Sequence, residues 1–503
     1  MSLPRVLALG FLAMAACAEP QTPAKVAESV PRPAPLPAPP PDPLGPKPEA
    51  HLPAPYAPPV PDVFVTKGGL TVWLVERHAL PYVAMTVSIP TGSSSDPKGK
   101  AGLAFETADM LDEGAGGRGS IELSRAVDAL GASLVTAATV DASTASLSVL
   151  KKNLVPAFTL LSDVVARPRF DPAEWKRAHE LELNDLVERA ADPEEVERLV
   201  TRAVLFGLDH PYAHPVDGTT TSAKSIVLED VRKFYLSAWR PDRAILVVVG
   251  DATKAEVTAL VDQNLGAWKS PTAAPPAPVA PEAFRGPWPR LVLVDRPEAP
   301  QSVISLARPG LAASDPREPV LARANLALGG LFTSRLNQDL REQRGYTYGA
   351  GSRVAHTRGV GSFVSYASVF TEKTADAVQA LVADVAEYAK TGPTNEETDK
   401  TRLQTRGDLV EKFEAYDRAA EHLAIEAALG LPADHERTAA LAADEATKEA
   451  LSKLASDCMD PSRAVVIVVG PAAKIEGPLR ALGYGEIEIR DTDGSVVKGK
   501  RAL

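Results

Sequence analysis

The chain repeats its own residue pattern at a nearly constant spacing, and this repeat limits its possible folds more than any other feature. The residues Val75-Glu76-Arg77, Pro81, Pro90 and Ser95-Asp96-Pro97 recur 219 positions later, as Val294-Asp295-Arg296, Pro300, Pro309 and Ser314-Asp315-Pro316. The run at 243–250 is echoed at 463–470, a separation of 220. A long repeat with fixed spacing indicates a duplicated structural unit. The sequence therefore predicts two halves with one topology.

Each half contains the same types of predicted element. A strand pair is expected at 70–76 and 83–89, and again at 291–295 and 302–307, because these runs are apolar and β-branched with turn residues between them. Apolar residues at three- and four-residue spacing predict helices at 124–130, 154–166 and 172–191. The continuous apolar runs 245–249 and 465–469 predict buried strands. The expected fold class is α+β: two homologous halves, each a mostly antiparallel sheet with helices on one face.

The first residues have the features of an export signal. Arg5 supplies a positive charge, and 6–16 form an apolar stretch that ends in small residues before Cys17. The run 12–17 resembles a bacterial lipobox, which implies lipidation of Cys17; a plain secretory signal remains the alternative. Both readings place the mature protein outside the cytoplasm. The lipobox reading places it in the cell envelope of a bacterium, and Ala18 after the cysteine favours a periplasm-facing outer-membrane lipoprotein by resemblance to Gram-negative lipoproteins. Only Cys458 is left elsewhere, so acylation of Cys17 excludes an intramolecular disulfide.

Proline-rich stretches divide the remaining chain. Residues 18–61 are rich in proline and alanine, which favours an extended spacer between a signal at 1–17 and the folded part. A second proline-rich stretch at 270–290 predicts a joint between an N-terminal domain at 62–269 and a C-terminal domain at 291–490, followed by a tail at 491–503. The formal net charge of −11 and the lack of a long basic run argue against nucleic acid as a partner.

Several short motifs give the chain a recognisable likeness to one protein family. They include Gly102-Leu103-Ala104 opening a helix, Leu130-Gly131-Ala132, Pro168-Arg169-Phe170, His210-Pro211-Tyr212 and the run Leu340 to Tyr348 with sequence LREQRGYTY. With these motifs the duplicated chain resembles the insulinase/pitrilysin family of zinc metallopeptidases, in particular its short-chain members related to the mitochondrial processing peptidase. The resemblance covers nearly everything after Pro61. It implies that the two halves form one half of a clamshell chamber.

The resemblance also implies where a zinc site would stand. Active members carry an inverted motif, His-x-x-Glu-His, on the helix after the Gly-Leu-Ala stretch, in which two histidines bind zinc and the glutamate activates water. Phe105, Ala108 and Asp109 occupy those three positions here, and Asp185 occupies the position of the distant glutamate ligand. Both histidines and the base are therefore missing, and no zinc is expected on this chain.

Other residues offer no clear substitute for the missing ligands. Glu106, Asp109 and Glu113 stand at helical spacing, but oxygen-only ligands suit calcium or magnesium better than zinc, and a solvated acidic helix face is the favoured interpretation. His210 and His214 are four residues apart, yet the prolines beside them make a continuous helix improbable, so both are expected in a loop.

The family's substrate-holding residues are present in the second half. The resemblance assigns an arginine and a tyrosine seven residues apart to substrate binding and transition-state stabilisation, and these match Arg341 and Tyr348. An arginine can bind a peptide carbonyl or carboxylate, and a tyrosine hydroxyl can donate to a developing oxyanion. For an arginine and a tyrosine outside this motif, a surface ion pair and core packing would be the favoured interpretations.

Three hypotheses follow for the function. The first is a non-catalytic subunit of a heterodimeric periplasmic endopeptidase, which binds peptides or unfolded polypeptide for a homologous partner that carries the zinc motif and the zinc. The second is a structural or binding scaffold with the peptidase fold and no proteolytic role, since a fold alone does not fix a function. The third is weak metallopeptidase activity through Asp109 and Asp185.

Overall fold

A computed structural model describes residues 54–272 and 289–497 of the 503-residue chain. All of them belong to one compact unit that spans Leu52 to Leu503. The predicted signal, Cys17, most of the 18–61 spacer, the centre of the 270–290 joint and the end of the tail lie outside the described residues.

The N-terminal half is built on a six-stranded sheet with the order β1-β2-β8-β3-β7-β6. Four of its five strand pairs are antiparallel, and only β2 and β8 run parallel. Its strands are β1 (Asp62–Val65), β2 (Thr71–Glu76), β3 (Tyr82–Ile89), β6 (Ser133–Ala138), β7 (Ser143–Leu150) and β8 (Ile245–Gly250). A separate two-stranded sheet joins β4 (Gly114–Ala115) to β5 (Arg118–Gly119).

The C-terminal half repeats this sheet, with the order β11-β12-β10-β13-β9-β14. Its strands are β9 (Leu291–Asp295), β10 (Gln301–Pro309), β11 (Thr347–Val354), β12 (Ser362–Phe370), β13 (Val465–Gly470) and β14 (Ile487–Arg490). Read in the opposite direction, β9, β13, β10, β12 and β11 take the places of β2, β8, β3, β7 and β6, so the predicted duplication is confirmed. Only the outermost strand differs, because β1 precedes its sheet in the chain and β14 follows it.

The two strands that open each half do not pair with one another as the sequence predicted. β8 lies between β2 and β3, parallel to the first and antiparallel to the second, and β13 lies in the same way between β9 and β10. The reason is that the continuous apolar runs of β8 and β13 satisfy their backbone groups only with a neighbour on both sides. The prediction that these runs are buried strands is confirmed.

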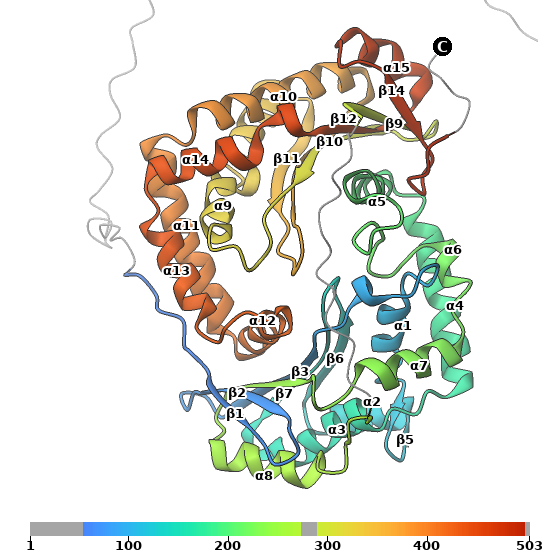
Figure 1. The fold of residues 1–503 in the computed structure, drawn as a ribbon, viewed down its shortest axis with the longest axis vertical. Helices are drawn as coiled ribbons and strands as arrows, with labels where there is room; N and C mark the ends of the chain where they lie inside the picture. The colour runs from blue at the N-terminus through green and yellow to red at the C-terminus, as the bar shows by residue number, and fades with distance from the viewer. Residues whose placement is uncertain (1–53, 273–288, 498–503) are drawn as a thin grey trace, which may run out of the picture. The chain divides into compact units, whose positions relative to one another are not determined.

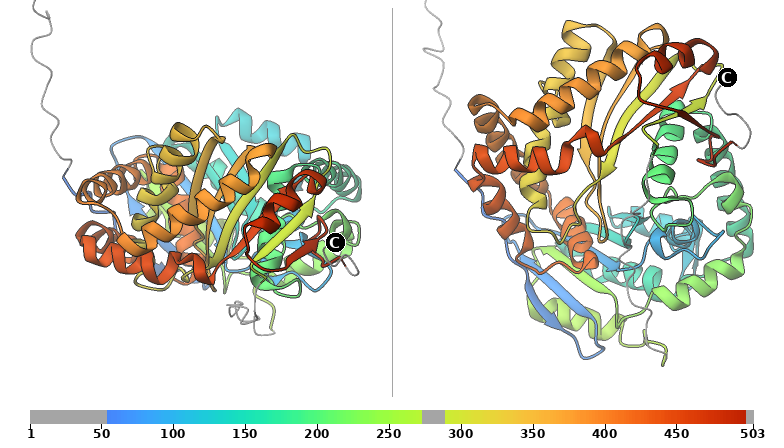
Figure 2. Two further views of the ribbon diagram at one scale, coloured as in Figure 1. Left: turned by 90° about the horizontal axis from the view of Figure 1, so that it is seen from above. Right: turned by 45° about the horizontal axis from the view of Figure 1, so that its top comes forward.

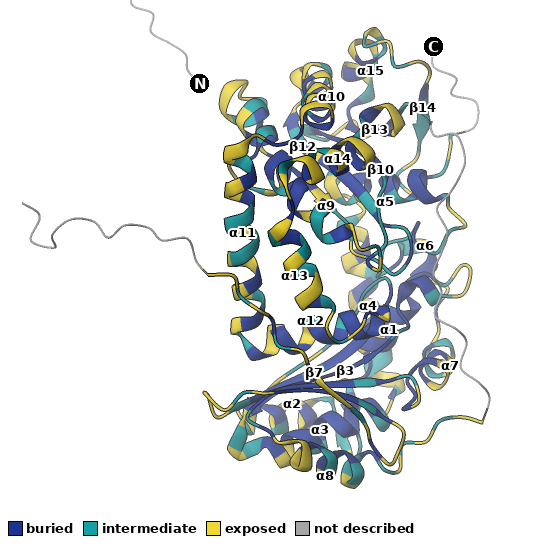
Figure 3. Ribbon diagram, turned by 60° about the vertical axis from the view of Figure 1, so that its left-hand side comes forward, coloured by how far each residue is buried: buried dark blue, intermediate teal, exposed yellow. Residues whose placement is uncertain are grey.

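Each half contributes several helices, most of which lie on the outer side of its own sheet. In the N-terminal half they are α1 (Leu103–Asp109), α2 (Ser120–Ala129), α3 (Leu154–Ala166), α4 (Pro172–Arg189), α5 (Pro193–Phe206), α6 (Thr220–Ala223), α7 (Leu228–Ala238) and α8 (Lys254–Asn264). In the C-terminal half they are α9 (Glu318–Asn325), α10 (Thr374–Thr391), α11 (Asn395–Glu414), α12 (Tyr416–Leu429), α13 (His435–Glu445), α14 (Lys448–Met459) and α15 (Ala472–Ala481), with π-helical segments at Leu326–Gly330 and Asn337–Gln343. Figure 3 shows the strands buried and exposed faces on α11 and α13.

One helix from each half crosses to the other half's sheet, which the sequence did not predict. The buried valines of α5 pack against β10 and β13, while Leu423 and its apolar neighbours on α12 pack against β3 and β8. Figure 1 shows α5 beside the second sheet and α12 beside the first, and in Figure 2 the green helix α5 lies on the side of the yellow strands opposite the orange helices. The helices of each half thus cover one face of its own sheet, as expected, and a helix of the other half packs on the second face.

A buried polar network joins the two halves. Asp141, in the loop after β6, accepts hydrogen bonds from the Tyr212 hydroxyl at 2.9 Å and from the Arg358 amide at 2.8 Å. The Arg358 guanidinium donates to the Asp141 carbonyl at 2.7 Å, and the Gly359 amide donates to the Tyr212 oxygen at 2.8 Å. Asp141 is only 2% exposed. This network explains the tyrosine of the His210-Pro211-Tyr212 motif as a structural contact between the halves.

The end of the predicted spacer belongs to the folded unit. Tyr56 lies beside Phe413 with ring centroids 6.2 Å apart, and the Pro58 carbonyl accepts two hydrogen bonds from the Arg437 guanidinium. Residues 54–61 are therefore not part of a free spacer, and the predicted boundary at Pro61 lies several residues too far along the chain. A proline-rich composition did not reveal this because proline retains a carbonyl that can accept hydrogen bonds.

Two glycines explain the backbone before α1. Gly102 has φ +98° and Gly218 has φ +82°, both in the region that favours glycine. A Cβ on Gly102 would lie 2.5 Å from the Asp217 carbonyl oxygen, and one on Gly218 would lie 2.1 Å from the Ala101 carbonyl oxygen. The start of α1 and the turn at 217–218 therefore contact each other through main-chain atoms alone. This contact fixes the position of α1, the helix that carries the zinc-motif positions.

No helix in 54–272 or 289–497 has both the length and the apolarity to cross a membrane. Cys458 is buried and unpaired, and its pKa is raised by burial.

Candidate functional site

The zinc-motif positions on α1 hold side chains that cannot bind zinc as a set. Phe105 is half-buried, Ala108 is 1% exposed, and Asp109 is exposed at the last residue of the helix. A phenyl ring and a methyl group supply no ligand and no base. One carboxylate remains where the family motif has two imidazoles.

Asp185, the position of the distant ligand, is exposed on α4. The buried carboxylate of this helix is Glu182, one turn earlier, and it forms an ion pair with Arg189 at 2.8 Å. The side chain that points into the protein at this level of α4 is thus already neutralised by an arginine.

An unforeseen pair fills the space between α1 and α4. His179 Nδ1 lies 2.8 Å from Glu106 Oε2, and Glu106 is only 3% exposed. Burial, together with the nearby charges of Glu182 and Asp109, raises the pKa of Glu106 to about 8, while burial lowers the pKa of His179. Both shifts favour neutral side chains, so a protonated Glu106 donates its hydrogen bond to a neutral His179.

The three acidic residues of the α1 region do not form the solvated helix face that was expected. Glu106 is buried, and α1 ends at Asp109, so Glu113 lies beyond the helix and pairs with Arg177. Only Asp109 faces solvent. One feature of the sequence indicates this arrangement: Glu106 falls between Leu103 and Met110 on the apolar side of the helix, where a carboxyl needs a partner.

The Glu106–His179 pair predicts a specific dependence of stability on pH. Because the Glu106 pKa is raised from its usual 4.5 to about 8, the folded state keeps a proton that the unfolded state has lost across this window. Stability should therefore fall as pH rises from 4.5 to 8. Replacing Glu106 with glutamine, which keeps a donor for His179, should stabilise the protein by about 1–3 kcal/mol at pH 8 and hardly at pH 4.5.

Urea unfolding at several pH values measures this effect. Glu188→Gln, an exposed position on α4, serves as the control and should leave the pH dependence unchanged. Equal pH dependence in Glu106→Gln and the wild-type chain would show that Glu106 is ionised in the folded state.

Arg341 lies on the surface of the C-terminal half. It belongs to the π-helical segment Asn337–Gln343, and its guanidinium lies 4.5 Å from the centre of the Phe332 ring, which is 70% exposed. Its charged neighbour is Glu342, whose carboxylate is 3.6 Å from Arg341 Nε. A guanidinium held against an exposed ring, with a third of the side chain exposed, keeps most of its donors available to a ligand.

Tyr348 is 80% exposed, so the core-packing interpretation is wrong for it. It lies near the start of β11, where the register with β12 shifts between Thr347 and Ala350. The Thr347 hydroxyl donates to the Ser368 carbonyl at 2.6 Å and accepts from the Gly349 amide at 3.0 Å, which holds this bulge in place. The Tyr348 ring meets Phe370 edge-on at 6.1 Å. The hydroxyl is thus presented to solvent on a fixed piece of backbone.

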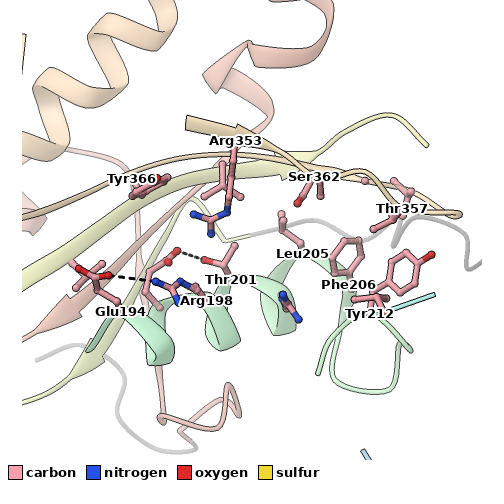
Figure 4. Close-up of a pocket in the computed structure, with 18 of the residues that line it drawn as sticks. Glu194, Arg198, Thr201, Leu205, Phe206, Tyr212, Arg353, Thr357, Ser362 and Tyr366 are labelled. Carbon is pink, nitrogen blue, oxygen red and sulfur yellow. Dashed lines mark hydrogen bonds and ion pairs between the residues drawn. The ribbon is translucent and has the colours of Figure 1, made fainter. Parts of the chain in front are cut away.

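A cavity of about 390 Å³ lies between α5 and the second sheet (Figure 4). Arg198, Arg202 and Arg353 line it together with Glu194 and aromatic side chains. Glu194 accepts a hydrogen bond from Ser368 at 2.7 Å, and the Arg353 guanidinium lies 4.8 Å from the centre of the Tyr366 ring. The lining suits an acidic or amide-containing ligand, but it holds no nucleophile paired with a base.

His210 and His214 lie in the loop between α5 and α6, as expected. His210 stacks on Phe206 with ring centroids 5.1 Å apart, and burial lowers the pKa of His214.

Two family models match the chain. The model described as insulinase (peptidase family M16) matches residues 71–208, and the model described as peptidase M16 inactive domain matches residues 225–405. Together they cover most of both halves.

Curated relatives with similar sequences carry differing names. A protein of Mycobacterium tuberculosis named an uncharacterized zinc protease is 29% identical over 347 residues, which is 68% of this chain and 78% of the relative. A protein of Helicobacter pylori named a non-peptidase homolog is 24% identical over 337 residues, 65% of this chain and 74% of the relative.

Solved structures share the fold. A peptidase M16 inactive domain from Pseudomonas fluorescens aligns with TM-score 0.73 and 26% identity, covering 82% of this chain and 98% of that one. A protease from Helicobacter pylori aligns with TM-score 0.76 and 17% identity, covering 83% and 100%.

Proposed function

Because the chain belongs to the insulinase, or peptidase M16, family, we propose that it is a non-catalytic, substrate-binding subunit of a heterodimeric peptidase. It binds a peptide or an unfolded polypeptide in a chamber and presents it to a homologous partner that carries the zinc. The observation that carries this proposal is a contrast between the halves: the zinc-motif positions hold Phe105, Ala108 and Asp109, while Tyr348 is exposed and Arg341 is partly exposed.

The chemistry of the exposed pair supports a role at another subunit's metal. Tyr348 offers an O–H donor to the oxyanion that forms when a peptide carbonyl is attacked, and Arg341 offers a planar fork to a substrate carbonyl or carboxylate. Neither side chain can activate water. Their effect on a reaction therefore requires a metal-bound nucleophile from elsewhere.

The N-terminus gives the proposed complex a place in the cell. We infer that Cys17 is lipidated and that the chain is an outer-membrane lipoprotein facing the periplasm, where the partner would also reside. This rests on the export signal and the lipobox-like run 12–17 alone.

Reconstitution tests the proposed function. The purified full chain is assayed with a quenched fluorescent peptide, alone and together with the homologue from the same genome that carries an intact His-x-x-Glu-His. We expect no turnover by either the chain alone or the partner alone, and turnover by the mixture.

Three other results would contradict the proposal. Turnover by the partner alone that this chain does not increase would favour a scaffold without a proteolytic role. A mixture that forms a complex but cleaves nothing would favour the same scaffold. Turnover by this chain alone that is lost in Asp109→Asn and in Asp185→Asn would favour weak activity of its own.

A further inference from the structure

Three of the chain's eight histidines gather at one place in the C-terminal half, away from the α1 region. They meet where α12 and α13 lie against the N-terminus of α9 and the loop between β11 and β12. Three carboxylates, each less than 10% exposed, lie among them. The six residues are His356, His422 and His435 with Glu318, Glu426 and Glu436.

Three of these residues already have the spacing of metal ligands. His422 and Glu426 are four apart on α12 and so point the same way, and Glu436 comes from the first turn of α13. One ligand atom from each lies within 4.8 Å of the other two, and no other such group of three occurs in residues 54–272 and 289–497. His422 Nε2 is 2.5 Å from Glu436 Oε1 and 3.8 Å from Glu426 Oε1.

Glu426 has a carboxylate oxygen in this cluster that accepts no hydrogen bond in the described chain. The residue is 2% exposed, and its Oε2 atom is buried without a hydrogen-bond partner in the described chain. A buried carboxylate oxygen without a partner costs about 1–3 kcal/mol. His435 Nε2 is 3.6 Å from this atom, too far for a hydrogen bond. Ligand atoms around tetrahedral zinc are separated by about 3.4 Å, given bonds of about 2.1 Å, so this distance suits two ligands of one ion. His435 lies outside the group of three whose ligand atoms are within 4.8 Å of one another, so its ring must move toward His422 and Glu436 to complete the set.

We propose that His422, Glu426 and Glu436, with His435 as the fourth ligand, bind one divalent transition-metal ion of the zinc class. Two imidazoles and two carboxylates form a mixed nitrogen and oxygen set, which suits zinc better than calcium or magnesium. The two carboxylate charges balance the charge of the ion. The site is unrelated to the α1 positions, and it changes the expectation that this chain binds no metal.

Neighbouring side chains support the ligands. His356 Nε2 lies 3.0 Å from Glu426 Oε1, and its Nδ1 lies 3.3 Å from Glu318, so His356 fixes Glu426 and leaves Oε2 for the ion. The His356 contacts orient Glu426 from behind. Lys412 Nζ lies 3.3 Å from Glu436 Oε1, the oxygen that also contacts His422, so the lysine must give up this contact when the ion binds.

His422 Nε2 and Glu436 Oε1 lie 2.5 Å apart, so the two atoms must separate to the spacing of ligands on one ion when the ion binds.

The site would strengthen the junction between the halves. α12 carries two of the ligands and is the helix that packs on the N-terminal sheet, while α13 carries the other two. Binding of the ion ties the two helices together at the point where the second half reaches the first. We therefore assign it a structural role.

Zinc binding to the purified full chain, after chelator treatment and dialysis, tests the proposal by calorimetry. The wild-type chain should bind one Zn²⁺, and its Tm should rise with zinc. His422→Ala and Glu436→Gln should each weaken binding about 100-fold or more and abolish the rise in Tm. Cobalt(II) should give the visible absorption of a tetrahedral site in the wild-type chain and should not do so in these two variants.

His78→Ala is the matched control, because His78 also contacts two carboxylates, Asp251 at 2.7 Å and Glu76 at 3.4 Å, but is more than half exposed. It should bind zinc as the wild-type chain does. Circular dichroism without metal establishes that each variant is folded, and Glu436→Gln keeps the shape of the side chain if His422→Ala does not fold. Failure of the wild-type chain to bind zinc, unchanged binding in Glu436→Gln, or loss of binding in His78→Ala would each overturn the proposal.

Discussion

Replacing Tyr348 with phenylalanine is expected to lower kcat about 100-fold in the proposed complex with a zinc-bearing partner, with little change in KM. The change removes one oxygen from a side chain that is 80% exposed and makes no contact through its hydroxyl in the described structure, so the fold should not respond. A hydroxyl that donates to the transition state alone affects kcat. Steady-state kinetics with the quenched peptide measure the effect.

Tyr346→Phe is the matched control for this change. Tyr346 lies two residues away on the same segment, and its ring is near Arg344 and Lys373. Its loss of a hydroxyl should leave kcat within about twofold, since a surface change of this kind costs under about 0.5 kcal/mol. Equal kinetics in Tyr348→Phe and the wild-type complex would remove Tyr348 from the reaction.

Arg341→Ala should act differently from Tyr348→Phe. If the guanidinium holds the substrate before and during the reaction, its loss raises KM and lowers kcat/KM about 10- to 100-fold. Arg344→Ala is the control, because Arg344 is a neighbouring surface arginine that is paired with Asp339 at 2.5 Å. An equal loss in both variants would indicate a general effect of positive charge.

The two-halved topology could be predicted because the sequence repeats one pattern of residues in both halves. Matching strand patterns at a spacing of 219 identified the duplicated sheets, and strands such as Leu291–Asp295 and the helix Leu154–Ala166 were predicted to the residue. The order of the strands within each sheet could not be predicted. A run of valines indicates that a strand is buried, but it does not indicate which strands lie on either side of it. The insertion of β8 between β2 and β3 came only from the structure.

The packing of α5 and α12 on the sheet of the opposite half could not be predicted for a similar reason. The buried valines of α5 give one apolar face, but helical periodicity does not say which sheet that face meets. Both sheets offer similar apolar surfaces because they are copies of one unit. Only three-dimensional packing distinguishes them.

The site residues divide according to their separation along the chain. Phe105, Ala108 and Asp109 could be placed because a motif fixes their spacing, whereas Glu106 and His179 are 73 residues apart and no motif links them. The sequence contains one weak indication of the proposed metal site on α12 and α13, a histidine and a glutamate four residues apart at 422 and 426. A search for histidine pairs alone overlooks it, because the second ligand is a carboxylate.

Asp141→Ala is expected to destabilise the chain by about 3–5 kcal/mol, the cost of breaking a buried ion pair by removing one partner. The Asp141 carboxylate accepts hydrogen bonds from the Tyr212 hydroxyl, from the Ser94 hydroxyl at 3.1 Å and from the Arg358 amide. The Arg358 guanidinium lies 3.5 Å from the same carboxylate. The loss removes an acceptor shared by both halves and leaves a nearly buried guanidinium without its carboxylate. Urea unfolding measures the change.

Asp251→Ala separates this effect from the loss of an ordinary acid. Asp251 pairs with His78 at the surface of the N-terminal half, and its loss should cost less than about 1 kcal/mol. Hydrogen exchange adds a second measurement: in Asp141→Ala the loops at 207–218 and 355–361 should exchange faster, because each lies on one side of the broken contact. If Asp141→Ala unfolds at the same urea concentration as Asp251→Ala, the halves are held together by the packing of α5 and α12 alone.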